Sequence, residues 1–104
     1  MTDKEMLAFA AIAYFPDAPR NIGEGVFDWV HDCKGDWNPR TDNADAFRLM
    51  VTLKMDVTFN TEDVFVWPQN GMKGSSELYN VDDPLAATRL AIVRAAAEIG
   101  KGMK

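Results

Sequence analysis

Two stretches of this chain each place an aspartate at the start of an amphipathic helix: Trp37-Asn-Pro-Arg-Thr-Asp-Asn-Ala-Asp-Ala46 and Asp82-Asp-Pro-Leu-Ala-Ala-Thr-Arg-Leu-Ala-Ile-Val-Arg-Ala-Ala-Ala-Glu-Ile-Gly100. A short acidic side chain at this position accepts hydrogen bonds from the free backbone amides of the first turn, so aspartate is a preferred helix cap. Asp42 and Asp83 are the predicted caps. Because both caps precede an apolar repeat of helical period, two helices are expected here.

A further helix is predicted at the start of the chain. Thr2-Asp-Lys-Glu5 fits a capping box, in which the threonine hydroxyl and the glutamate carboxylate each accept a hydrogen bond from the other residue's backbone amide. Apolar residues then recur at spacings of three and four, and Pro16 ends the pattern.

Short strands are predicted between the last two helices. Asp56-Val-Thr-Phe-Asn60 and Val64-Phe-Val-Trp67 are separated by Thr61-Glu-Asp63, which indicates a hairpin, and Ser76-Glu-Leu-Tyr-Asn80 is a candidate third strand. In Val64-Phe-Val-Trp67 both faces are apolar. This pattern is typical of a strand that is covered on both sides, so we expect layers on both faces of the sheet.

The predicted elements follow the order helix, loop, helix, three strands, helix. They span residues 3–14, 43–54, 56–60, 64–67, 76–80 and 84–100. We expect a single α+β domain over residues 1–104, a three-layer α/β/α sandwich whose short, mainly antiparallel sheet is flanked by helices. A chain of 104 residues is the size of one domain with one ordinary core.

Composition and charge exclude several classes of protein. The formal net charge is −5, with 16 acidic and 11 basic residues, which weighs against direct nucleic-acid binding through phosphates. The longest apolar stretch is about ten residues, whereas a membrane helix needs about 20, so neither a membrane span nor a signal peptide is expected. A single cysteine permits no internal disulfide and favours a cytoplasmic location.

The residues from Trp37 to Gly100 resemble a family of small proteins encoded by phages and prophages, the phage α–β–α (ABA) sandwich domain proteins. The resemblance rests on Trp37-Asn-Pro-Arg-Thr-Asp42, the helix that begins at Asp45-Ala-Phe-Arg-Leu49, the apolar strand that ends at Trp67, and Asp83-Pro-Leu-Ala-Ala-Thr-Arg-Leu-Ala-Ile-Val-Arg-Ala-Ala-Ala97. It implies a fold and a phage origin. Together with the single cysteine, this origin leads us to expect a location in the cytoplasm of the host cell. These motifs are not catalytic, so the resemblance implies no reaction.

Candidate catalytic and metal-binding residues are few. His31-Asp-Cys33 contains the only histidine and the only cysteine. A zinc site needs three or four ligands, and a cysteine nucleophile needs an oriented base, so this pair favours neither chemistry. The glycines form no phosphate-binding motif. We therefore expect no enzyme activity, no cofactor and no metal.

The stretch 16–40 carries the candidate interaction surface, and its apolar run Val26-Phe-Asp-Trp-Val30 is interpreted as an edge strand or a packed loop. Aspartates recur there every four residues, which would form one acidic face on a helix, although Gly35 and the aromatic content argue against a helix. Trp29 is either an exposed residue that anchors an interface or an apolar residue that packs at the edge of the core. The candidate surface residues are Asp28, Trp29, His31, Asp32 and Asp36.

The function favoured by this sequence is that of a small, non-enzymatic phage or prophage accessory protein that binds a host or phage protein. Self-association into a homo-oligomer is left open. One alternative is an acidic inhibitor that occupies the basic site of a host nucleic-acid-binding or defence protein, since complementary charge favours such a complex. A second alternative is a small metal-binding protein or enzyme.

Overall fold

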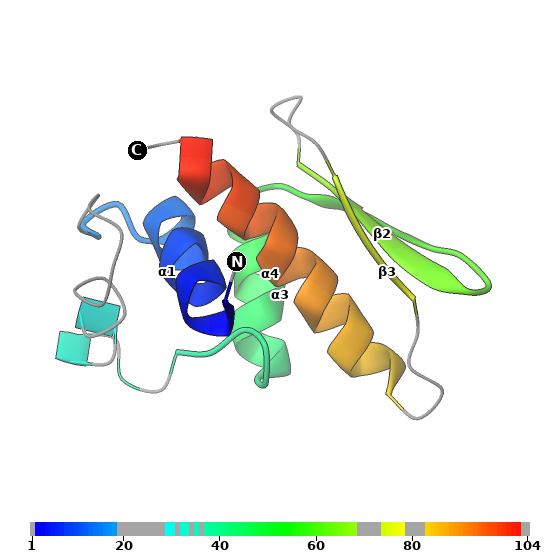
Figure 1. Cartoon of the computed structure of the whole chain (residues 1–104), viewed down its shortest axis with the longest axis horizontal. Coiled ribbons are helices and arrows are strands. Elements are labelled where there is room, and N and C mark those ends of the chain that lie inside the picture. Colours follow the sequence, from blue (N-terminus) through cyan, green and yellow to red (C-terminus); the bar gives the residue numbers. More distant parts are fainter. Residues whose placement is uncertain are drawn as a thin grey trace.

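A computed structural model describes residues 2–18, 29–30, 32–33, 35, 37–68, 74–78 and 83–102. Its elements, in chain order, are α1 (Asp3–Tyr14), α3 (Asn43–Thr52), β1 (Asp56–Phe59), β2 (Asp63–Trp67), β3 (Ser75–Leu78) and α4 (Pro84–Gly102) (Figure 1). The order and the strand pairing confirm the predicted α+β fold. No helix in these ranges is both long and apolar enough to cross a membrane.

The sheet is an antiparallel meander with the strand order β1-β2-β3. The first two strands form the predicted hairpin, in which Phe59 pairs with Val64. The Asn60 backbone amide donates to the Asp63 carbonyl at 2.8 Å, and the Asn60 side-chain amide donates to the Asp63 carboxylate at 2.8 Å. The loop between them is therefore a tight two-residue turn at Thr61-Glu62.

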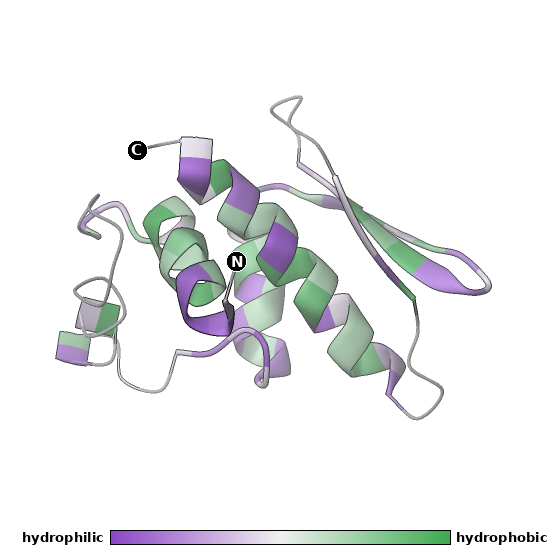
Figure 2. Cartoon of the chain, viewed as in Figure 1, coloured by the Kyte–Doolittle hydropathy of each residue, from purple (hydrophilic) through white to green (hydrophobic). Residues whose placement is uncertain are grey.

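Helix α4 lies at the centre of the fold, because it packs against β2 and β3 on one side and against α1 and α3 on the other. Both α1 and α4 are mostly apolar along their length (Figure 2). Helices α1 and α4 approach closely at Gly100, where an added Cβ atom would overlap the Phe9 carbonyl oxygen. The residues three and four positions before Gly100, which share its face of α4, are the small buried Ala97 and Ala96.

The predicted capping residues all occupy cap positions. The Thr2 hydroxyl accepts from the Glu5 amide at 3.1 Å, which completes the capping box of α1. Hydrogen bonds from the backbone and side chain of Thr2 hold the pKa of Glu5 below its ordinary value, so the box weakens as the pH falls and Glu5 is protonated. Asp42 accepts from the Ala44 amide at 2.8 Å, and Asp83 accepts from the Ala86 amide at 3.0 Å.

The predicted cover on both faces of β2 is wrong at the end of the strand. Val64 and Val66 are fully buried toward α4, whereas Phe65 is half-buried and Trp67 is 49% exposed. Within the described residues, α4 is the helix that packs broadly on the sheet, and it covers one face. The apolar pattern on both faces thus correctly predicted a strand. The second covering layer that it also predicted does not extend over Trp67.

Two further predictions about local structure are corrected. The helix predicted at 43–54 ends at Thr52, because Lys54 adopts a left-handed conformation with φ 55°. The Met55 amide bonds back to the Met50 carbonyl, which is the Schellman arrangement that ends a helix. Trp29 and Val30 are helical, as are the described residues 32 and 33, rather than an edge strand or a loop.

We expect that replacing Asp83 by alanine lowers the free energy of unfolding by about 1 kcal/mol, the usual loss for an N-cap. The reason is that the Ala86 amide loses its acceptor. Urea denaturation measures the change. Glu62→Ala, in the exposed hairpin turn, is the control and should stay within about 0.5 kcal/mol of the parent. Equal midpoints for both variants would show that Asp83 contributes no cap.

We expect that Gly100→Ala destabilises the protein by about 3 kcal/mol, the upper end of the usual cost of overpacking. The added methyl group meets a backbone oxygen of α1, which moves only if the helix moves. Gly102→Ala, at the exposed end of the same helix, is the matched control and should cost nothing, since alanine is the better helix former. Thermal unfolding that ranks the two variants equally would contradict this close helix contact.

Candidate functional site

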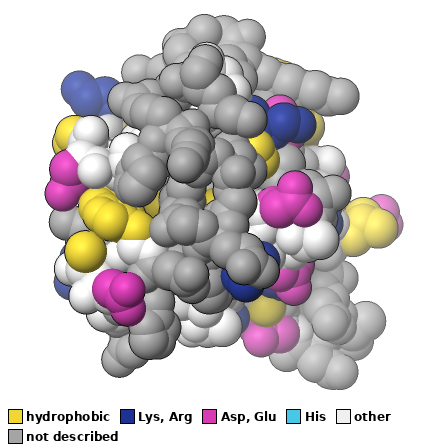
Figure 3. Space-filling view, turned by 60° about the vertical axis from the view of Figure 1, so that its left-hand side comes forward, with side chains coloured by type: hydrophobic (Ala, Val, Ile, Leu, Met, Phe, Trp, Pro, Cys, Tyr) yellow, Lys and Arg dark blue, Asp and Glu magenta, His cyan; other side chains and the backbone are white. Residues whose placement is uncertain are grey.

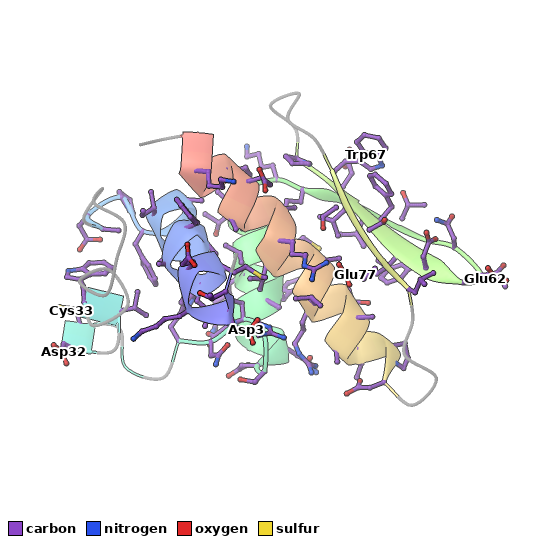
Figure 4. All side chains as sticks on the ribbon, viewed as in Figure 1. Asp3, Asp32, Cys33, Glu62, Trp67 and Glu77 are labelled. Carbon is purple, nitrogen blue, oxygen red and sulfur yellow. The ribbon has the colours of Figure 1, made fainter. Side chains whose placement is uncertain are left out.

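The face of the sheet that points away from α4 carries an aromatic pair, the half-buried Phe65 and the exposed Trp67. Side chains alternate along β2, so Phe65 and Trp67 share this outer face. Their ring centroids are 4.3 Å apart. Figure 4 shows Trp67 on the side of the sheet away from α4. Gly74 lies beside the Phe65 ring, since an added Cβ atom there would meet the ring.

Carboxylates border this aromatic pair at both ends of the outer face. The strand register places Asp56 opposite Trp67, and Asp63 opposite Leu78, whose side chain is 75% exposed. Glu62 lies at the tip of the hairpin (Figure 4). Among the described residues of the three strands and their hairpin turn, there is no lysine or arginine. We call Asp56, Asp63, Phe65, Trp67 and Leu78 the outer face.

A second apolar surface is a hollow of about 640 Å³ between α3, β1 and α4. Three large apolar side chains stand exposed around it: Phe47 (61%), Phe59 (65%) and Leu85 (59%). We call this hollow the groove, and its lining residues are Asn43, Ala44, Ala46, Phe47, Met50, Val57, Phe59, Leu85, Thr88, Arg89 and Ile92. Such a lining offers shape and apolar area for binding and no carboxylate, histidine or cysteine for acid–base or nucleophilic catalysis.

Arg89 is the one charged residue in the lining of the groove. Its Nε atom donates to the Arg40 carbonyl at 2.6 Å, and its Nη1 atom donates to the Asn43 side chain at 2.6 Å. Arg40 in turn forms an ion pair with Asp3 at 2.6 Å. Arg89 therefore ties α4 to the segment that leads into α3, and it fixes the wall of the groove.

Asp32, a described residue of the candidate surface predicted from the sequence, lies at the opposite end of the molecule from the hairpin tip (Figure 4). Asp32 and Cys33 are exposed there (Figure 4). Asp28, His31 and Asp36 lie outside the described residues, so the predicted acidic face has one described member. Figure 3, turned toward this end, shows acidic and basic side chains interspersed over the described surface. This surface stays a prediction.

Trp29 and Trp37 belong to an aromatic cluster at the end of α1. Trp29 is half-buried and lies edge-on to Phe15, with ring centroids 5.7 Å apart. Trp37 stacks on Tyr14 at 5.7 Å and contacts Phe15 at 5.0 Å. Both tryptophans pack against the core. Trp37 therefore packs against the end of α1. The third tryptophan, Trp67, is exposed, although the apolar pattern of its strand predicted cover on both faces.

Within the described ranges, no three histidine, cysteine or acidic side chains lie close enough together to hold a metal ion. The comparisons with known proteins find no match among family models, curated proteins or solved structures. The resemblance to phage proteins therefore rests on the motifs quoted above.

We expect the outer face to contribute little to stability. Leu78→Ser should change the free energy of unfolding by less than about 0.5 kcal/mol, as for other surface substitutions. Val66→Ala, on the buried face of the same sheet, should cost on the order of 2 kcal/mol. Both values can be measured by urea denaturation. A cost for Leu78→Ser as large as that for Val66→Ala would mean that the outer face is part of the core.

Proposed function

We propose that this chain is a small, non-enzymatic accessory protein that acts by binding another protein through its outer face. The observation that carries this proposal is the pair of the exposed Trp67 and the half-buried Phe65 on a sheet face that α4 does not cover. Tryptophan is enriched among the residues that dominate binding energy at protein interfaces, because it buries a large area at little cost in conformational entropy.

The carboxylates around the aromatic pair favour a partner with a basic surface. Asp56 and Glu62 are exposed, and the neutral side-chain amide of Asn60 is the hydrogen-bond donor to the Asp63 carboxylate. An apolar surface bordered by lysine or arginine side chains would complement this arrangement, since it buries the two rings and neutralises the acidic border. The proposed partner is therefore a protein with an apolar patch and a basic rim.

A phage or prophage origin, supported by the resemblance of residues 37–100, would place this partner in an infected cell. The same carboxylates favour a second candidate function, in which the chain inhibits a host nucleic-acid-binding or defence protein. Such a protein presents lysine and arginine side chains where it binds phosphates. The outer face has carboxylates and, in its described strands, no lysine or arginine. Its charge is therefore complementary to a basic phosphate-binding site.

The test compares four proteins: the parent, Trp67→Ser, Asp56→Lys and Asp32→Lys. Affinity capture from the lysate of infected cells supplies candidate partners, and calorimetry with the purified pair measures the affinity. We expect Trp67→Ser to weaken binding by about 30-fold, which corresponds to the loss of a hot spot of about 2 kcal/mol. Asp56→Lys should weaken binding most at low salt, because charge steers association.

Asp32→Lys is the control, since it makes the same change of charge at the other end of the molecule (Figure 4). It should leave the affinity within about twofold of the parent. The opposite result, with loss at Asp32 and none at Asp56 or Trp67, would contradict the outer face and favour the surface predicted from residues 28–36. Circular dichroism of each variant establishes that its fold is unchanged.

A further inference from the structure

The strand β1 has an open edge with unpaired backbone groups. It lies at one end of the strand order, and β2 covers its other side. The hydrogen bond between Asn60 and Asp63 fixes the alternation of the ladder, so Thr58 and Asp56 carry the bonds to β2. The amide and carbonyl groups of Val57 and Phe59 therefore point away from β2. In the described part of the chain, no backbone group pairs with them.

The two edges of the sheet differ in their protection. Exposed edge strands usually carry a lysine, a proline, a bulge or an inward-pointing charge that prevents pairing with another chain. On β3, Glu77 points inward and forms an ion pair with Arg94 of α4. The open edge of β1, Val57-Thr-Phe59, has none of these features. Phe59 is instead 65% exposed beside the groove.

We infer that the open edge of β1 binds a second copy of this chain in antiparallel orientation, with Thr58 of one copy opposite Thr58 of the other. In this register Val57 of each copy faces Phe59 of the other, and each facing pair exchanges both backbone hydrogen bonds. The two three-stranded sheets then form one continuous sheet. The dimer is two-fold symmetric, so both copies use the same surface.

The side chains support this register. Val57 opposite Phe59 is a β-branched residue against an aromatic ring, and Thr58 opposite Thr58 is a hydroxyl pair, both favourable across antiparallel strands. Asp56 comes opposite Asn60, so no two carboxylates face each other. A register centred on Val57 would pair Phe59 with Met55, whose amide already donates to the Met50 carbonyl at 3.0 Å. In the register centred on Thr58, the pair that contains Phe59 does not compete for the Met55 amide.

The groove gives the second copy an apolar surface to cover. Val57 and Phe59 lie on the side of β1 that lines the groove. Since paired residues in a sheet share a face, the Val57 and Phe59 side chains of an added β1 strand lie on the groove side too. They extend the apolar surface around Phe47 and Leu85, which are exposed in the single chain. The proposed partner surface is separate from the outer face, so this inference does not depend on the proposed function.

Sedimentation equilibrium over micromolar to millimolar concentration tests the inference. We expect the parent to form a reversible dimer and Val57→Pro to weaken dimerisation at least tenfold, because proline removes an amide that points to the open edge. Ser76→Pro is the matched control. Its amide points to the open edge of β3, so this variant should dimerise like the parent. Circular dichroism shows whether each variant keeps the parent fold.

A cysteine at the two-fold axis tests the register without disturbing the backbone. In a Cys33→Ser background, Thr58→Cys should form a disulfide-linked dimer on mild oxidation. Facing residues of an antiparallel pair have Cβ atoms ~4.5–5.5 Å apart, and a disulfide can bridge the shorter of these distances. Ser76→Cys in the same background should stay monomeric on a non-reducing gel. This readout decides the question if Val57→Pro fails to fold.

Three results would overturn the inference. The first is a parent that stays monomeric at millimolar concentration. The second is a dimer that Trp67→Ser abolishes and Val57→Pro does not, which would assign self-association to the outer face. The third is cross-linking of Ser76→Cys as efficient as that of Thr58→Cys, which would show random collision rather than pairing of β1 edges.

Discussion

The contact between Gly100 of α4 and the backbone of Phe9 in α1 is the constraint on which the rest of this small fold depends. It brings α1 and α4 together with no side chain between their backbones at this point, and the small side chains of Ala96 and Ala97 lie on the same face of α4. Dispersion attraction and apolar burial are then concentrated in one helix pair. Because α4 is held against α1 on one side, its opposite side is free to support β2 and β3.

Local signals in the sequence predicted most of the fold. The caps Thr2, Asp42 and Asp83 were identifiable because a cap depends on the side chain of one residue and the amides of the next turn. The hairpin was predictable for the same reason, since its turn and its strands lie within a dozen residues. The order of elements and the antiparallel pairing follow from these short-range features and short connections.

Features that depend on distant parts of the chain were not predictable in this way. Trp67 has the pattern of a core residue, and its exposure is decided by the absence of a helix against that face among the described residues. Lys54 takes a conformation that usually selects glycine, so the end of α3 had no sequence signal. The groove needs three elements to meet, and the periodicity of no single segment indicates it. The surface predicted around Asp32 rests on residue types that are rare in this sequence. The outer face consists of residue types that are common in strands, so composition does not single it out.

The ion pair between Glu77 and Arg94 has a consequence for assembly. A sheet with two open edges can add copies without end, which is how fibres grow. Here Glu77, which points inward from β3, makes the approach of another strand costly, because a strand paired along this edge would strip water from the charged Glu77–Arg94 pair. In the proposed dimer, the two β1 edges are both used once two copies have paired. Glu77 on the four-residue strand β3 would then disfavour growth beyond two copies.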